Sequence, residues 1–286
     1  MFLLPTIPAE ASLALNSFIL HPSSFTMTEE NIRTINMQQW IKIIFISCIL
    51  AQIFLLICDY VFNYQDIFED KSIRRIWNIA RENSIPTWFA AMQAQALGIT
   101  VFLIASIQTP SISRLKLWAW ILIGMFFLWI GIDDMAEIHE KLGGAIERMI
   151  SKNGEEEWGG LIGILLKNPS FAWHAFIAPF FAVCGLLIAL FLWTAFWQHN
   201  LTRYLVLGFG CWIIAQGIDF TEGLENIDDY YLYLKDSLGI EEKYGVSHTF
   251  KLVEEELEML GTTLLWIGFL HYFANIANGI HIKLVK

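Results

Sequence analysis

Residues 115–140 read LKLWAWILIGMFFLWIGIDDMAEIHE, an apolar stretch that ends in a cluster of ionisable side chains. Its apolar part, Leu115–Met135, is long enough to cross a bilayer as a helix, which takes about 20 mostly apolar residues. A carboxylate near hydrocarbon costs about 2.5 to 3.5 kcal/mol on insertion scales, so charges at this place mark a candidate functional site. The charged or titratable residues at its end are Asp133, Asp134, Glu137, His139 and Glu140.

The composition points to the same class of protein. Hydrophobic residues make up 56% of the 286 residues and charged residues only 16%, and the mean hydropathy is +0.50, whereas soluble domains carry about a quarter charged residues. The sequence therefore predicts an integral membrane protein whose surroundings are a lipid bilayer. A net charge of -10 without any Lys/Arg-rich block excludes a nucleic-acid partner.

Six stretches are long and apolar enough to span a membrane, and no strand alternation or long repeat competes with them. The predicted fold class is all-α, an integral membrane helix bundle with about six transmembrane helices. The segment Lys71–Glu82 reads as a short amphipathic helix, and Ser84 as the N-cap of the second span. The predicted spans are Trp40–Tyr60, Thr87–Ile107, Leu115–Met135, Phe171–Trp197, Tyr204–Phe220 and Leu257–Phe273.

The chain divides into three predicted parts. Residues 1–39 form an N-terminal segment that is expected to be partly disordered, and Met27 opens a polar stretch typical of a true translation start. Residues 40–275 form the six-span domain, and residues 276–286 form a cytoplasmic tail.

The orientation follows from the loops that carry Lys and Arg. Basic residues cluster on one side of the predicted topology, at Arg33, Lys42, Arg114, Lys116, Arg203, Lys283 and Lys286. The other side holds acidic loops such as Glu155–Glu157, so the positive-inside rule predicts a bacterial inner-membrane protein with both termini in the cytoplasm. The first loop opposes this reading, because it carries Lys71, Arg74, Arg75 and Arg81.

This topology brings the acidic ends of several spans to the non-cytoplasmic face. On a continuous helix, Asp133, Glu137 and Glu140 would share one stripe. Asp219 and Glu222 are i, i+3 neighbours, as are Glu255 and Glu258. The candidate ligands of a cation are Asp133, Glu137, His139, Glu140, His174, Asp219, Glu222, Glu255 and Glu258.

Clustered carboxylates repel one another, so their burial requires a cation or protons. Oxygen ligands together with imidazole suit a divalent Zn, Fe or Mn ion. His139 points more than a quarter turn away from Asp133 on such a helix, so it fits either as a ligand offered to another helix or as a proton relay. The four cysteines show no CxxC spacing, which argues against a cysteine metal site.

Three functions remain open from the residues. The first is a metal-dependent membrane enzyme that acts on a lipid-like substrate. The second is a cation- or proton-coupled transport or sensing protein, although the predicted charges stop at one face. The third is an accessory subunit whose acidic face meets a membrane-protein partner or a second copy of the chain. For any single carboxylate, a solvated helix end without a function is the simplest interpretation.

Three motifs carry a resemblance to a known family. They are Glu82-Asn-Ser-Ile-Pro-Thr-Trp88 before one span, Asp133-Asp-Met-Ala-Glu-Ile-His-Glu140 at the end of another and Glu255-Glu-Leu-Glu-Met-Leu-Gly261 in the last. In this order they resemble an uncharacterised family of bacterial multispanning membrane proteins, over most of residues 40–275. Asp134 stands where that family usually has Glu. The resemblance implies a membrane fold but no activity.

Overall fold

The computed structural model describes residues 32–34, 36–63, 70–153, 165, 170–240, 243–277 and 281–283. The predicted start at Met27 and the acidic loop Glu155–Glu157 lie outside the described residues. Two short strands, β1 (Ile32–Thr34) and β2 (His281–Lys283), pair antiparallel in a small unit of their own. The helices belong to a second compact unit, residues 36–279.

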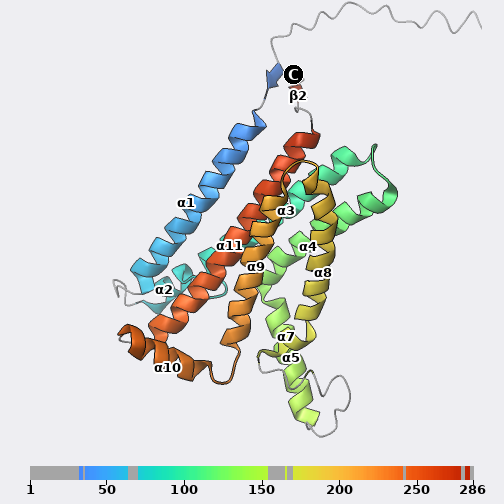
Figure 1. Cartoon of the computed structure of the whole chain (residues 1–286). Coiled ribbons are helices and arrows are strands. Elements are labelled where there is room, and N and C mark those ends of the chain that lie inside the picture. The colour runs from blue at the N-terminus through green and yellow to red at the C-terminus, as the bar shows by residue number, and fades with distance from the viewer. Residues whose placement is uncertain are drawn as a thin grey trace, which may run out of the picture. The chain divides into compact units, whose positions relative to one another are not determined.

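The second unit confirms the all-α prediction, because six helices among its described residues are long and apolar enough to cross a membrane. The protein is therefore a multi-pass membrane protein. The spanning helices are α1 (Met37–Asn63), α3 (Ile85–Gln108), α4 (Arg114–Ala136), α8 (Ala178–Trp197), α9 (Thr202–Glu222) and α11 (Lys243–Ile276). Shorter helices, which gather at one end of the bundle in Figure 1, are α2 (Lys71–Trp77), α5 (Ile138–Asn153), α7 (Ala172–Phe176) and α10 (Ile227–Leu238).

Several helix boundaries differ from the predicted ones. The predicted span Phe171–Trp197 is divided at Ile177, because Pro179 lies in the first turn of α8 and lacks the N–H that a continuous helix would need. The last helix begins at Lys243 and has 34 residues, so it is longer than the predicted span. Ser84 caps α3 as predicted, since its Oγ accepts a hydrogen bond from the Thr87 N–H at 3.3 Å.

Helix α11 lies at the centre of the unit and packs against α1, α3 and α9. It meets α9 at a pair of glycines: a Cβ on Gly208 would lie 3.0 Å from the Gly261 carbonyl oxygen, and a Cβ on Gly261 would lie 2.8 Å from that of Gly208. Small residues let helices in a membrane approach this closely. The close approach brings the last turn of α9 next to the first half of α11.

A neutral polar contact ties three helices together inside the bundle. The Thr263 Oγ1 of α11 accepts hydrogen bonds from Gln52 Nε2 of α1 at 2.9 Å and from Gln93 Nε2 of α3 at 2.8 Å. Outward-facing side chains of the spans are large and apolar, for example Leu50, Leu122 and Ile213. This surface fits lipid tails, as a bilayer-embedded bundle requires.

Candidate cation site

Three carboxylates from two helices converge where α9 ends beside α11. Asp219 and Glu222 lie in the last turn of α9, as the i, i+3 spacing predicted, and Glu254 comes from α11. One oxygen of each lies within 4.8 Å of the others. Asp219 and Glu254 are buried and Glu222 is half-buried. We call these three residues the carboxylate group.

Lys251 is the nearest basic side chain in the described part of the chain. Its Nζ donates to Glu254 Oε1 at 2.7 Å and lies 3.8 Å from Asp219 Oδ1 and 3.8 Å from Glu255 Oε1. The lysine therefore contacts one oxygen of Glu254 and one of Asp219. The second oxygen of Asp219 lies beside His174, and the second oxygen of Glu254 forms no hydrogen bond within the described residues.

His174 lies on the short helix α7 and contacts Asp219 of the carboxylate group. Its Nε2 lies 3.2 Å from Asp219 Oδ2, and its Nδ1 lies 3.2 Å from Ser170 Oγ. Ser170 donates its own hydroxyl proton to the Phe220 carbonyl at 2.7 Å. The ring is stacked beside Trp173 and meets Phe220 edge-on, so its orientation is held by aromatic contacts as well.

Several buried polar atoms around the carboxylate group form no hydrogen bond with any residue that the structure describes. Because buried polar groups in folded proteins are nearly always paired, atoms of this kind call for an explanation. Tyr231, from α10, is one of them: burial, and then the charges of Glu222, Glu254 and Asp228, raise the pKa of Tyr231. The atoms in question are His174 Nε2, Glu222 Oε1, Glu254 Oε2 and the Tyr231 hydroxyl oxygen.

The motif Asp133–Glu140, which spans the end of α4, does not form the predicted helical stripe of carboxylates. Helix α4 ends at Ala136, and Glu137 adopts a left-handed conformation with φ 52° and ψ 40°, after which α5 starts in a new direction. The prediction that Asp133, Glu137 and Glu140 share one helical face is therefore wrong. A left-handed residue ends the helical repeat on which the spacing argument depends.

Asp133 instead binds His139 across this break. The backbone N–H of His139 donates to Asp133 Oδ1 at 2.9 Å, and its Nδ1 lies 2.7 Å from Asp133 Oδ2. Burial on its own lowers the pKa of His139, but the hydrogen bond and charge of Asp133, followed by the charges of Glu140 and Glu258, raise it above the usual value overall. This pair stabilises the turn between α4 and α5.

The neighbouring acidic residues make local contacts. Glu137 Oε1 accepts from Asn83 Nδ2 at 2.9 Å, and Glu140 is exposed. Glu82, in the turn before α3, has a buried Oε2 without a hydrogen-bond partner. Burial, followed by the charges of Glu140, Glu137 and Glu258 and opposed by Lys251, raises the pKa of Glu82 from 4.5 to about 7.

Glu255 and Glu258 lie on α11 beside the carboxylate group. Glu255 Oε1 is 3.8 Å from Lys251 Nζ, and Glu258 Oε1 accepts from Gln216 Nε2 of α9 at 3.1 Å. The nine predicted ligands thus do not form one shell. Asp219 lies beside Glu222 and beside His174, and a role in metal binding for all nine stays a prediction.

A third carboxylate–imidazole pair joins α1 to α11. Asp59 Oδ2 lies 2.8 Å from His248 Nε2, and both side chains are buried. Asp59 Oδ1 accepts from Asn63 Nδ2 and from the Ile79 N–H, each at 3.0 Å. His248 Nδ1 lies 3.3 Å from the Tyr244 hydroxyl. Both oxygens and both nitrogens of this pair have partners.

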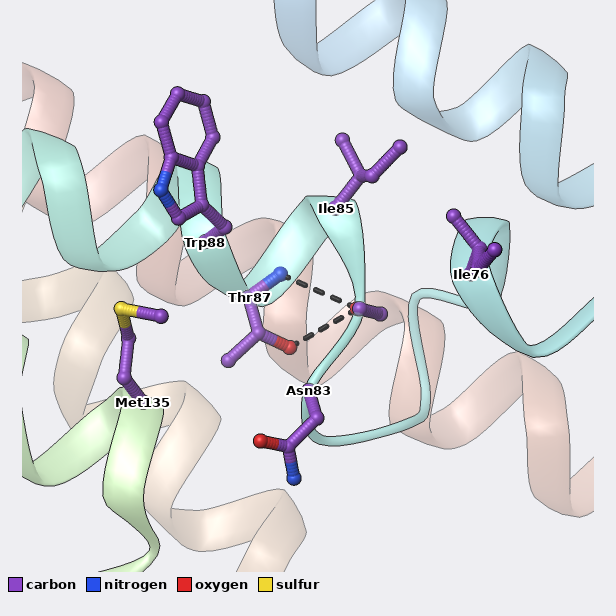
Figure 2. A pocket seen from close by; sticks show the side chains of 7 residues that line it. Ile76, Asn83, Ile85, Thr87, Trp88 and Met135 are labelled. Atoms are coloured by element: carbon purple, nitrogen blue, oxygen red, sulfur yellow. Dashed lines mark hydrogen bonds between the residues drawn. The ribbon is translucent and has the colours of Figure 1, made fainter.

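A cavity of about 280 Å³ lies at the start of α3 and does not include the carboxylate group. Figure 2 shows Trp88 and Met135 along one side of it and Ile76 on the other. Its hydroxyls are already engaged with one another, since Ser84 Oγ and Thr87 Oγ1 lie 3.0 Å apart. The lining residues are Ile76, Asn83, Ser84, Ile85, Thr87, Trp88 and Met135.

The predicted ligand set lacks four residues of this neighbourhood. Glu254 is one of three consecutive glutamates on α11, and successive helical positions differ by about 100°, so only the packing of α9 decides which of them faces Asp219. Lys251 was detectable as an i, i+3 partner of Glu254. Ser170 stands four residues before His174, a spacing that the sequence shows but that does not by itself indicate a role, and Tyr231 carried no signal that could be read without the fold.

Comparison with known proteins places the chain by family only. The model of a family described as a domain of unknown function (DUF8692) matches residues 44–273. No curated protein and no solved structure matches the chain.

Proposed function

We propose that this chain, which belongs to the DUF8692 family, binds a divalent cation at the carboxylate group of Asp219, Glu222 and Glu254. The observation that carries the proposal is the convergence of three carboxylates, each with an oxygen within 4.8 Å of the others. Like charges buried together are unfavourable unless a cation or protons neutralise them. A divalent cation on these oxygens would remove the repulsion.

Lys251 supports the proposal because it leaves suitable oxygens free. Its ammonium contacts Glu254 Oε1 and Asp219 Oδ1, whereas Glu254 Oε2 and Glu222 Oε1 form no hydrogen bond. One lysine also carries too little charge to balance three carboxylates. The lysine and a bound cation would therefore use different sides of the same group.

The position of the group favours chemistry or binding at one membrane face over conduction. Residues 259–270 of α11 contain no ionisable side chain, and the buried polar contact of Gln52 and Gln93 with Thr263 is neutral. Ion pathways instead carry charged or coordinating groups near the middle of the membrane. Because the group lies at one membrane face, we propose a lipid-like substrate at the depth of the headgroups. A divalent cation there would supply Lewis acidity and lower the pKa of bound water.

Metal analysis of the full chain, purified in detergent without chelator, tests the proposal. We expect one divalent cation per chain, which Asp219→Asn and Glu254→Gln remove and which Glu225→Gln, a change at an exposed residue beyond α9, leaves in place. No bound cation after exposure to Mg²⁺, Ca²⁺, Mn²⁺ and Zn²⁺, or equal binding by all variants, would overturn it.

Two further assays separate the uses of the cation. Lipid extracts incubated with the loaded protein, followed by mass spectrometry, should show conversion that Asp219→Asn abolishes. Cation flux into proteoliposomes that the same substitution abolishes would instead identify a transporter and contradict the proposed chemistry.

A further inference from the structure

The hydrogen bonds around His174 determine which of its ring nitrogens carries a proton. A carbonyl oxygen only accepts, so the Ser170 hydroxyl, 2.7 Å from the Phe220 carbonyl, donates its single proton there. Ser170 Oγ can then only accept from His174 Nδ1 at 3.2 Å. The Nδ1 nitrogen therefore carries the proton, and in the neutral ring Nε2 presents its lone pair to the carboxylate group.

In the neutral ring, and without a further group, this arrangement sets two acceptors against each other, whereas a second ring proton would make the contact an ion pair. Nε2 of His174 lies 3.2 Å from Asp219 Oδ2 and forms no hydrogen bond within the described part of the chain, although the imidazole side chain is only 7% exposed. Two ligand atoms about 2.0–2.1 Å from one tetrahedral ion lie about 3.3 Å apart. The spacing of this nitrogen and this oxygen is thus suited to a shared ion.

Within the described part of the chain, His174 Nε2 contacts Asp219 alone among the carboxylates, and the group whose ligand atoms lie within 4.8 Å of one another is made of the three carboxylates. We infer that His174 Nε2 binds the same ion as Asp219 once the side chains of Glu222 and Glu254 close on it, and that the site prefers Zn²⁺ over Mn²⁺, Mg²⁺ and Ca²⁺. Imidazole suits Zn²⁺, whereas sites made only of oxygen suit Mn²⁺, Mg²⁺ and Ca²⁺. This inference rests on the proposed function, since it adds a ligand to the same site.

Ser170 is then a positioning residue. Histidine ligands usually donate their second ring N–H to an oxygen, which fixes the tautomer and the ring orientation, and loss of such a partner typically costs about 10- to 100-fold in metal affinity. Here the chain runs from Nδ1 through Ser170 Oγ to the backbone of α9. It links the orientation of the ligand to the helix that supplies Asp219 and Glu222.

Calorimetric titration of the full-length, detergent-purified protein with Zn²⁺, Mn²⁺, Mg²⁺ and Ca²⁺ tests the inference. We expect Zn²⁺ to bind more tightly than Mn²⁺, Mg²⁺ and Ca²⁺, because imidazole suits Zn²⁺ whereas the other three ions prefer oxygen ligands. His174→Gln should remove that preference and leave the weaker Mg²⁺ and Ca²⁺ binding in place. His199→Gln, a change to a histidine that packs on Tyr272 of α11, is the matched control and should leave the preference unchanged.

Ser170→Ala provides a test that keeps the imidazole. It should weaken Zn²⁺ binding by about tenfold, while pulsed EPR of the Mn²⁺-loaded protein still detects a coordinated nitrogen, and His174→Gln should abolish that nitrogen signal. An unchanged metal preference or an unchanged nitrogen signal in His174→Gln would overturn the inference while leaving the carboxylate site intact. If His174→Gln does not fold, absence of a nitrogen signal in the unaltered protein overturns it equally. Failure of the unaltered protein to bind any of the four ions would instead overturn the proposed function.

Discussion

Two carboxylate–imidazole pairs lie beside the first half of α11, and they differ in how many of their polar atoms form hydrogen bonds. In the Asp59–His248 pair, each carboxylate oxygen and each ring nitrogen has a hydrogen-bond partner from the protein. In the Asp219–His174 pair, the nitrogen beside the carboxylate forms no hydrogen bond within the described residues. The first pair is complete without a ligand, whereas the second leaves a nitrogen available for the cation proposed above.

Removal of the complete pair should have the largest effect on stability. Asp59→Ala leaves His248 and the Ile79 N–H buried without their acceptor, and breaking such a buried pair costs about 3–5 kcal/mol. We expect a large fall in the thermal unfolding temperature in detergent. The metal-free Asp219→Ala protein should lose less, because this change also relieves repulsion with Glu222 and Glu254. Equal losses for both variants would remove the distinction between the pairs.

The effect on cation affinity should have the opposite order. Asp219→Asn removes a proposed ligand, so affinity should fall by more than the about 10- to 100-fold that outer-shell partners contribute. Asp59→Asn should leave affinity unchanged in whatever fraction of the protein folds. Calorimetric titration of both variants checks this. A cation that binds less well to the Asp59 variant would show that the saturated pair also takes part in binding.

Loss of Lys251 should strengthen cation binding by a smaller factor. Its ammonium lies within 4 Å of Asp219 and Glu254, so a cation held by the same carboxylates would be repelled by it. Lys251→Met should therefore raise affinity by about tenfold, or 1.4 kcal/mol, and lower the stability of the metal-free protein. Lys235→Met on α10 serves as the control. Weaker binding by Lys251→Met would mean that the lysine organises the ligands rather than competing with the cation.

The smallest expected effect concerns Glu82, which lies outside both pairs. Its pKa is about 7 in the folded protein and about 4.5 when unfolded, so between these values the folded state binds more protons and stability falls as pH rises. Glu82→Gln should flatten this slope between about pH 4.5 and 7 in unfolding experiments. The effect stays modest because the side chain is only partly buried and solvent screens it. A slope that persists in the variant would assign the titration to another group.

The fold could be predicted from the sequence because its signals are local. Length and hydropathy indicate the six spans, and Ser84 followed by Pro86 indicates the start of α3. The break at Glu137 was not predictable in this way. The Ala-Glu-Ile-His run carries no glycine or proline, and the Asp133–His139 contact that stabilises the turn exists only in the folded chain.

The sequence predicted the types of residue that form the candidate site, but only some of the individual residues. Asp219 and Glu222 follow from helical spacing within one segment. Glu254 depends on the rotation of α11 against α9, which the contact between Gly208 and Gly261 determines. The sequence predicted His174 and not His248 as a ligand, and the folded chain agrees in one respect, since both ring nitrogens of His248 have hydrogen-bond partners.

The length of α11 relates the site to the thickness of the membrane. Its 34 residues extend about 51 Å at 1.5 Å per residue, well beyond a hydrocarbon core of about 30 Å. Residues 259–276, which follow the last glutamate, cover about 27 Å of it. If residues 259–276 fill the hydrocarbon core, the acidic turns of this helix stand where acyl chains give way to headgroups. Longer lipid tails would draw them into hydrocarbon, and hydrophobic mismatch would then favour whichever state of the site carries the least net charge.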